Sequence, residues 1–508
     1  MKKTILLVGL ITIFGGCDKS VMEPTLEAYA PVSLDEKAGT WKTYILTAAN
    51  EITVAEPKAT TSAEYQAELS KLKTASSSLS AEQRRAVEFW GAGAVYRWNE
   101  IGRELAARYN LPPAPDANGK YPVPDPNNPL ADPKFPFANP PYTSRALAYL
   151  SVAQYDALVS AWHYKYKYNR KAPSKVDSGI TAALPVTELP SYPSEDAVVA
   201  AASYSILIKM FPGEVPYLEK MMKECQQARL WAGMNVESDI IAGDALGKAV
   251  GAKVMGYAAT DGMSGANNQS LMPRFTELAQ KIGIKDPWVS QETPARPAML
   301  PNFGALKTWN FTRSQLEAMR PVVPYVVGSP EWQKEYEELR AIQRNQTREQ
   351  ARIANYWADG AGSYTPPGHW HREAANLCHK YKLSEVCTAR TLALVGTALM
   401  DAGIGCWEAK YHYMTPRPQQ FGIKTSVGLP NFPAYTSGHS TFSAAAATVL
   451  GGIFPAEAKK MNDKAKEASE SRVYGLIHFR IDCDLGLVHG KKIGEYALAR
   501  GKNDNSGL

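Results

Sequence analysis

Apolar residues recur at helical spacing through most of this 508-residue chain, and this periodicity constrains the fold more than any other feature. They fall at positions i, i+3, i+4 and i+7, which places them along one face of a helix. Strand-like alternation is nearly absent, and no repeat appears at the periods of about 20–50 residues that mark solenoids. The segments expected to be helical are 80–109, 145–165, 195–211, 215–234, 238–259, 330–357, 373–381, 386–410, 440–454, 456–476 and 486–500. The sequence therefore predicts an all-α protein of helical bundles.

Long proline-rich loops are expected between some of these helices. Eleven prolines fall between Pro112 and Pro141. Proline lacks the backbone N–H that helices and central strands need, so this segment is predicted to be a long surface loop. Thr143 or Ser144 is then expected to cap the helix that follows, because both side chains can accept a backbone N–H.

The N-terminus has the pattern of an export signal. Two lysines precede an apolar run over residues 5–14, which ends in Gly-Gly-Cys17. The apolar run is too short to span a bilayer permanently. The pattern looks like a bacterial lipoprotein signal, with residues 1–16 removed and Cys17 lipidated; the alternative is an ordinary signal peptide with an incidental cysteine. We expect a lipoprotein of the bacterial cell envelope, periplasmic or on the outer surface, held at a membrane through the lipid anchor alone.

Composition and cysteine content limit the other possibilities. The net charge of +6 is small and unclustered, which argues against a nucleic-acid partner. None of the cysteines after Cys17 shows the spacing of metal ligands. Cys378 and Cys387 are candidates for a disulfide in an oxidising compartment, and the sequence leaves their pairing open.

Three short segments near the C-terminus carry residues suited to holding a tetrahedral oxyanion. They read Lys-x6-Arg-Pro, Ser-Gly-His and Ser-Arg-x5-His-x3-Asp. Their chemistry-bearing residues are Lys410, Arg417, Ser437, Gly438, His439, Arg472, His478 and Asp482. Ammonium and guanidinium groups pair with phosphate-like ions, and the backbone N–H groups at a helix start bind anions. Each segment alone is more typical of a solvated helix end or an N-cap than of an active site; the ordered set of three is specific.

The His478–Asp482 spacing predicts a second feature of this site. Residues four apart lie on one face of a helix, so the Asp482 carboxylate can accept the proton on one imidazole nitrogen of His478. The other nitrogen is then free to act as a nucleophile or a metal ligand.

The ordered set of motifs resembles the active site of the type 2 phosphatidic acid phosphatase and vanadium haloperoxidase superfamily. Thr436 departs from the pattern, since the family usually has proline before Ser-Gly-His. The blocks 354–374 and 401–413 look like the bacterial haloperoxidase branch, whereas Pro416 stands where many haloperoxidases have tryptophan. The resemblance implies two four-helix-bundle-like units. It divides the chain into a signal peptide (1–16), an N-terminal tether and variable segment (17–79), an N-terminal helical half (80–335) and a catalytic half (336–508).

The resemblance also implies a role for each residue. His478 would bond vanadium, or attack phosphorus, and Asp482 would orient it. His439 would be the acid or base on the opposite side. The groups that would hold the oxyanion's oxygens are Lys410, Arg417, Ser437, Gly438 and Arg472.

Two enzymes fit this arrangement. A vanadium-dependent haloperoxidase would hold vanadate as its cofactor and use hydrogen peroxide and halide. An acid phosphatase would need no cofactor and would hydrolyse phosphomonoesters through a phosphohistidine. The large N-terminal helical half and the 354–374 block favour the haloperoxidase. The halide, the organic acceptor and the oligomeric state stay open.

Overall fold

The computed structural model describes residues 22, 26–123, 128, 130 and 135–507; the signal sequence and Cys17 lie outside the described residues. The described part is helical, with no strand, so the all-α prediction is confirmed. The α-helices are α1 (Ala63–Ser77), α2 (Ala81–Gly91), α3 (Ala94–Tyr109), α4 (Pro140–Tyr168), α5 (Pro173–Val176), α6 (Glu195–Met210), α7 (Val215–Trp231), α8 (Glu237–Ala258), α9 (Met272–Lys281), α10 (Arg313–Met319), α11 (Pro330–Asn345), α12 (Arg348–Tyr356), α13 (Thr365–Lys380), α14 (Glu385–Tyr413), α15 (Gly438–Ile453), α16 (Ala458–Tyr474) and α17 (Arg480–Lys502). Short 3-10 helices lie between them: η1 (Glu36–Thr40), η2 (Pro212–Glu214), η3 (Met263–Gly265), η4 (Gln269–Leu271), η5 (Phe303–Ala305), η6 (Pro418–Phe421) and η7 (Pro455–Glu457).

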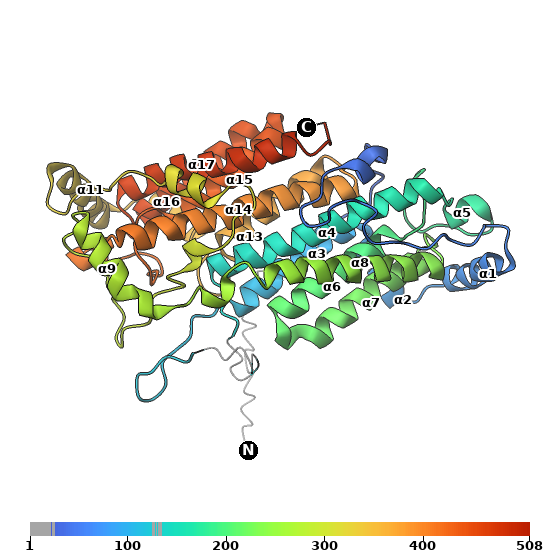
Figure 1. The fold of residues 1–508 in the computed structure, drawn as a ribbon, viewed down its shortest axis with the longest axis horizontal. Helices are drawn as coiled ribbons and strands as arrows, with labels where there is room; N and C mark the ends of the chain where they lie inside the picture. The colour runs from blue at the N-terminus through green and yellow to red at the C-terminus, as the bar shows by residue number, and fades with distance from the viewer. Residues whose placement is uncertain (1–21, 23–25, 124–127, 129, 131–134, 508) are drawn as a thin grey trace, which may run out of the picture.

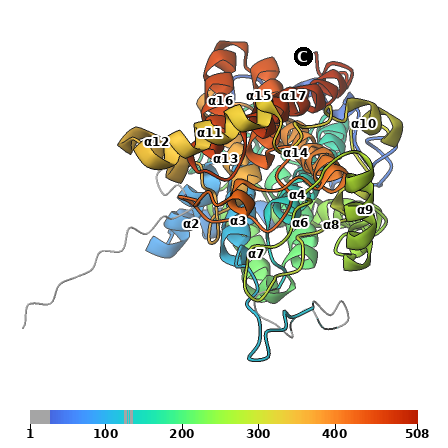
Figure 2. The same ribbon diagram turned by 90° about the vertical axis from the view of Figure 1, so that its left-hand side faces the viewer.

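Two helical bundles make up the body of the molecule (Figure 1). One contains α4, α6, α7 and α8, and the other contains α14, α15, α16 and α17. Seen from one end, the second bundle lies above the first (Figure 2). The two-bundle architecture that the resemblance implies is therefore present.

The longest helices, α4 and α14, join the two bundles back to back. Each has 29 residues, and most positions in both are buried. They run antiparallel, because Gly396 approaches Ala148 while Gly403 approaches Ser144. Among the described residues, only the region Glu385–Phe421 is long and apolar enough to cross a membrane, and its apolar window is entirely buried inside the protein. The pair forms the core that both bundles share.

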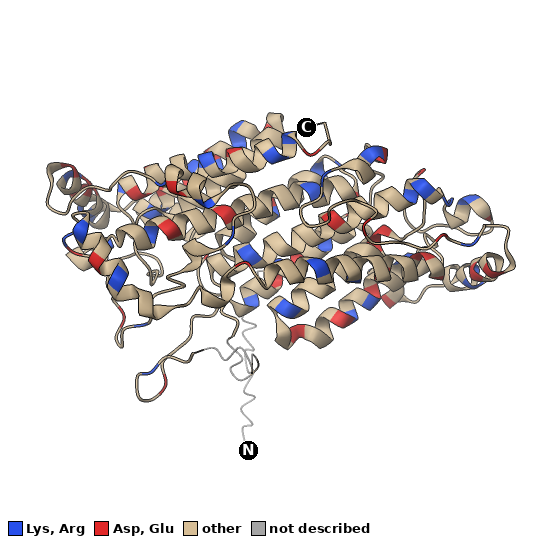
Figure 3. Cartoon of the chain, in the orientation of Figure 1, with Lys and Arg blue, Asp and Glu red and all other residues tan. Residues whose placement is uncertain are grey.

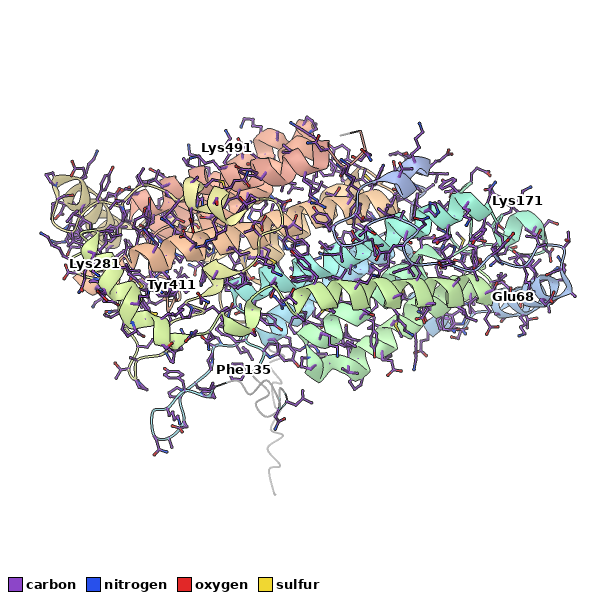
Figure 4. All side chains as sticks on the ribbon, in the orientation of Figure 1. Glu68, Phe135, Lys171, Lys281, Tyr411 and Lys491 are labelled. Carbon is purple, nitrogen blue, oxygen red and sulfur yellow. The ribbon has the colours of Figure 1, made fainter. Side chains whose placement is uncertain are left out.

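Charged residues of both signs are scattered along the helices, as Figure 3 shows for one view. Lys491 on α17 and Lys281 at the end of α9 are examples on the periphery (Figure 4). This pattern agrees with the small and unclustered net charge read from the sequence.

Several helix boundaries differ from the sequence-based expectation. The cap of α4 is Asn139, whose side chain accepts the N–H of Tyr142, and prolines occupy the first helical positions, where their missing N–H costs nothing. The segment expected over 80–109 is broken at Gly93, and the one over 330–357 is broken between α11 and α12, where Thr347 caps a new helix. Helix α13 begins eight residues earlier than expected, at Thr365.

The N-terminal segment after residue 26 lies against the bundles. The backbone N–H groups of Tyr44, Ile45 and Leu46 donate to the buried carboxylate of Asp156 on α4, over 2.7–3.1 Å. The N–H of Lys42 donates to the carbonyl of Asp504 near the other end of the chain. Residues 26–79 therefore include packed structure as well as the variable segment that the sequence suggested.

Glycine stripes allow two pairs of helices to touch through their backbones. A Cβ on Gly490 of α17 would lie 2.1 Å from the carbonyl oxygen of Thr441 on α15. A Cβ on Gly247 of α8 would lie 2.3 Å from the carbonyl oxygen of Val198 on α6. No side chain fits at these distances, so the helices α15 and α17, and likewise α6 and α8, pack closer than larger residues would permit.

Gly490→Ala is expected to lower the free energy of unfolding by about 3 kcal/mol, because α15 and α17 must separate to admit the methyl group. Gly256→Ala is the matched control: Gly256 lies inside α8, and a Cβ there meets nothing within 4 Å. That change is expected to raise the free energy of unfolding by up to about 1 kcal/mol through helix propensity. Denaturant unfolding measures both, and equal effects from the two substitutions would contradict the close backbone contact.

Candidate active site

The three sequence motifs meet at one end of the second bundle. Lys410 lies in the last turn of α14, and Arg417 follows that helix, immediately before η6. Ser437 caps α15, and Gly438 and His439 are its first residues. Arg472 is in the last turn of α16. Tyr411, next to Lys410 on α14, marks this end of the molecule in Figure 4.

The Lys410 ammonium is fully buried and binds the turn that leads to α15. Its Nζ donates to the carbonyl oxygens of Pro433, Ala434 and Thr436 at 2.9, 2.6 and 2.6 Å. Three bonds use all three ammonium donors, so in this state Lys410 shapes the turn and contributes charge. To donate to an oxyanion it would have to exchange one carbonyl.

Two buried guanidinium groups flank the site. Arg417 donates through Nε to the carbonyl of Phe432 at 2.8 Å and through Nη1 to the carbonyl of Ile477 at 2.7 Å. Its Nη1 also lies 3.5 Å from Nε2 of His478, which places a positive charge against the free side of that ring. Arg472 donates to the carbonyl of Ala354 and to the hydroxyl of Ser471, both at 2.8 Å.

His478 and Asp482 form a hydrogen-bonded pair. Nδ1 of His478 lies 2.9 Å from Oδ2 of Asp482, and the same oxygen accepts the N–H of Phe479 at 3.1 Å. A carboxylate oxygen that accepts a backbone N–H is an acceptor for Nδ1 as well, so Nδ1 carries the proton and Nε2 keeps its lone pair. The predicted contact is present, but the expected helical face is wrong. His478 precedes α17, and Asp482 reaches back to it from the first turn of that helix as part of the helix cap.

His439 is in the first turn of α15. Its Nε2 is buried and has no hydrogen-bond partner among the described residues. The backbone of Trp357 and Ala358 acts on the ring and opposes the lowering of its pKa. Nε2 of His439 is therefore available to a ligand.

Positive charge in the site has little internal compensation. Within the described part of the chain, none of Lys410, Arg417 and Arg472 forms an ion pair with a carboxylate, although each is at most 1% exposed. Asp482 is the one acid of the motifs, and it binds His478. Buried cations without a counter-charge are costly, so the charge at this end of the bundle suits an anion.

The pKa shifts reflect this charge balance. Burial, together with the neighbouring Arg417, lowers the pKa of Lys410 to about 8. Burial lowers the pKa of Arg417 and of Arg472 to about 10 each. Burial, opposed by Lys410 and Arg417, raises the pKa of Asp482 to about 7.

The two histidines are shifted in the direction that keeps them neutral. Burial, and then the charges of Arg417 and Lys410, hold the pKa of His478 well below its ordinary value. Burial and the charge of Arg472 do the same to the pKa of His439. At neutral pH both rings are uncharged, so His478 presents a lone pair at Nε2.

The segment 354–369 adds residues to which the sequence reading assigned no role. Nδ1 of His369 lies 3.2 Å from a carboxylate oxygen of Asp359, and its ring stacks on Trp357 at 4.5 Å between centroids. Nε2 of His369 is buried without a partner among the described atoms. The sequence already marked this block as similar to the haloperoxidases. It did not pair Asp359 with His369, because no spacing rule joins residues ten apart across a loop. Cys378 and Cys387 are free thiols in the structure.

Comparison with family models gives no match, and neither does comparison with curated proteins. Among solved structures, the chain is similar to the first bacterial vanadium-dependent iodoperoxidase, with a TM-score of 0.57 and 23% identity over 71% of this chain and 91% of that one. It is also similar to a holo-type bacterial vanadium-dependent chloroperoxidase, with a TM-score of 0.50 and 13% identity over 76% of this chain and 97% of that one. This is the fold of the bacterial vanadium-dependent haloperoxidases. The fold of the chain is thereby shown, and its chemistry has to be argued from the site.

Proposed function

We propose that this protein is a vanadium-dependent haloperoxidase, with vanadate held at His478. The observation that carries the proposal is a set of three buried cations around a neutral histidine, none of which pairs with a carboxylate in the described part of the chain. The donor set suits vanadate: Nε2 of His478 is a ligand atom, and the guanidinium groups complement its oxygens. The fold shared with two vanadium-dependent haloperoxidases supports the same cofactor.

Each residue has a distinct task in this proposal. His478 supplies the bond to vanadium through Nε2, and Asp482 fixes its tautomer by accepting the Nδ1 proton. Arg417 and Arg472 neutralise the oxygens, while Lys410 holds the 433–436 turn that presents Ser437 and the N-terminus of α15.

His439 acts as the acid or base that moves the proton of hydrogen peroxide, through the free Nε2. When bound, vanadate acts as a Lewis acid that polarises the peroxide toward attack by halide.

The decisive experiment measures two activities of the purified mature chain with and without orthovanadate. We expect peroxide-dependent oxidation of iodide, bromide or chloride that requires vanadate, and little hydrolysis of p-nitrophenyl phosphate. The same neutral His478 backed by Asp482 would serve a phosphatase as nucleophile. Phosphate-ester hydrolysis that vanadate inhibits, without halide oxidation, would therefore replace the proposal by that alternative.

Oxyanion binding is expected to weaken as the pH rises above about 8. Lys410 without an anion has a pKa of about 8, and a bound anion raises it, so binding takes up a proton. Below pH 8 Lys410 already carries this proton, so its titration does not change the affinity there. Above pH 8 the affinity for the oxyanion should fall by about tenfold per pH unit. Tungstate is the probe because its charge stays constant over this range. Lys410→Met should bind more weakly and lose this slope; an unchanged slope in the variant would contradict the assignment.

A further inference from the structure

The spacing of the active-site motifs occurs a second time in the N-terminal half. Four residues of the site have counterparts 243 positions earlier: Ser194, Arg229, Asn235 and Asp239 precede Ser437, Arg472, His478 and Asp482. The Arg-x5-His-x3-Asp motif thus returns as Arg-x5-Asn-x3-Asp. Lys165 and Arg170 precede Lys410 and Arg417 by 245 and 247 positions. Pro193 precedes Ser194, so the N-terminal copy has the proline that the family motif usually places there. The C-terminal copy has Thr436 at that position.

The helices that carry the two sets correspond in length and order. Helices α4 and α14 have 29 residues each, α6 and α15 have 16 each, and α7 and α16 have 17 each. A 3-10 turn beginning with proline, η2 or η7, separates the second and third helix of each set. The C-caps of α4 and α14, Asn169 and Met414, both adopt the left-handed conformation.

The hydrogen bonds of the two sets also correspond. The N–H of Ser194 donates to the carbonyl of Asp239 at 3.0 Å, as Ser437 does to Asp482 at 2.8 Å. Nζ of Lys165 donates to the carbonyl of Pro190 at 2.6 Å, as Lys410 does to Pro433, again 243 positions later, at 2.9 Å. Two unrelated bundles would not share such specific contacts, so the N-terminal half contains a second copy of the cradle.

The copies lie at opposite ends of the molecule. Lys171, which follows Arg170, and Tyr411, which follows Lys410, mark these two ends in Figure 4. The antiparallel packing of α4 against α14 accounts for this placement, because each cradle is built at the C-terminal end of one of the two helices.

The decisive difference is the charge at the start of the second helix of each set, α6 or α15. Where the C-terminal copy has Gly438 and His439, the N-terminal copy has Glu195 and Asp196. Glu195 pairs with Lys165 at 2.7 Å and with Arg229 at 3.1 Å. Asp196 pairs with Arg229 at 2.9 Å. Burial raises the pKa of Glu195, but the charges of Lys165 and Arg229 outweigh it and lower the pKa overall, so Glu195 is an anion at neutral pH.

The charges of the N-terminal copy therefore cancel. Its three cations, Lys165, Arg170 and Arg229, face three carboxylates, because Arg170 pairs with Asp239. In the C-terminal copy none of the three cations forms an ion pair with a carboxylate of the described residues. Asp482 acts on Lys410 and Arg417 without pairing with them, and Asp359 acts on Arg472 in the same way. We propose that residues 165–239 form a second oxyanion cradle that is closed from within, with the carboxylates of Glu195 and Asp196 in the place of the anion. Removing the two negative charges should open it to a tetrahedral oxyanion.

A cavity gives an oxyanion access to this second cradle. It encloses about 120 Å³ and is lined by Glu195, Asp196, Arg229 and Asn235, together with Trp90 and Ser191. Asn235 stands where the C-terminal copy has His478. It can donate a hydrogen bond but cannot act as a nucleophile or a strong metal ligand, so the opened site should bind an oxyanion without catalysis.

The test compares vanadate stoichiometry, by equilibrium dialysis, in wild type and in the double variant Glu195→Gln, Asp196→Asn. We expect one vanadate per chain in wild type and two in the variant, with halide oxidation per chain unchanged. The use of vanadate rests on the proposed function. If wild type binds none while the variant binds one, the C-terminal assignment fails and the second cradle stands. Glu219→Gln is the control, because Glu219 is an exposed carboxylate of the same bundle, and it should still bind one.

Two results would overturn the second cradle: a wild type that binds two vanadates, or a double variant that binds no more than wild type. The variant leaves Lys165 and Arg229 without carboxylate partners, so it is less stable, and its melting temperature should rise more with vanadate than that of wild type. Asp196→Asn alone keeps Glu195 paired and should bind the second oxyanion with lower affinity.

Anomalous scattering from tungstate in crystals of the double variant would locate the ion beside Arg229. A variant that stays unfolded with vanadate present counts against the proposal.

Discussion

His478→Ala is expected to abolish tight vanadate binding and halide oxidation together. The substitution removes the only bond from the protein to vanadium in the proposed site, and it leaves Asp482 buried without its partner. Vanadate affinity measured by dialysis and halide oxidation at saturating peroxide should both fall to background. The paired loss is what distinguishes a metal ligand from a residue that acts only in turnover.

His163→Ala provides the control for His478→Ala. His163 is a half-buried histidine on α4 whose ring contacts Tyr164, and it lies outside both cradles. It should keep vanadate affinity and activity near those of wild type. Retention of tight vanadate binding by His478→Ala would remove the proposed ligand.

His439→Ala is expected to keep vanadate while losing about 10²–10⁴-fold in turnover, the usual range for a general acid or base. Nε2 of His439 is buried and has no partner among the described residues, so it is placed to move a proton and makes no structural contact there. Vanadate affinity should fall modestly, because one hydrogen-bond donor or acceptor is lost.

The two histidine variants together test the assignment of roles. Loss of vanadate by His439→Ala with retention by His478→Ala would reverse the roles. Unchanged vanadate affinity in both would leave the cofactor without a protein ligand and would favour the phosphatase. Added imidazole is a further check on His439→Ala, since a small base can enter the space that the side chain leaves and restore part of the turnover.

Much of the fold and of the C-terminal site was predictable from the sequence. Helical periodicity is a local property, and it gave the all-α class and most helices. The motif residues are close together in three segments, so their order and spacing identified Lys410, Arg417 and His478 as site candidates. Their convergence in the structure is visible in the contacts of Lys410 with Thr436 and of Arg417 with His478.

The sequence did not reveal which atoms these residues bind. Lys410 donates all its protons to backbone carbonyls, and this depends on the path of the 433–436 turn. His478 lies before α17, because the Asp482 carboxylate caps that helix as well as holding the ring. The bonds of Lys410 and the place of His478 both depend on the conformation of loops. The helical periodicity of the sequence does not determine that conformation.

The second cradle was missed for a different reason. Solenoid repeats recur at periods of about 20–50 residues, whereas this repeat has a period of 243 residues and occurs once. Its most recognisable positions have also changed: Gly438 and His439 correspond to Glu195 and Asp196, and His478 to Asn235. A histidine-based motif cannot find a copy without histidines, and the shared hydrogen bonds are visible only in three dimensions.

The glycine stripe on α17 has a consequence for how this protein can diverge. His439 is on α15 and Asp482 is on α17. The backbone of α15 contacts α17 directly at Gly490, where no side chain separates the two helices. The separation between His439, the proposed acid or base, and Asp482, which positions His478, is thus fixed by main-chain contact, and exchanges of core side chains elsewhere in the bundles cannot change it. Sequence drift can then alter the apolar interior widely while the geometry of the reacting groups stays constant. Such separation of stability from active-site geometry makes the scaffold tolerant to mutation and leaves specificity to evolve in the loops.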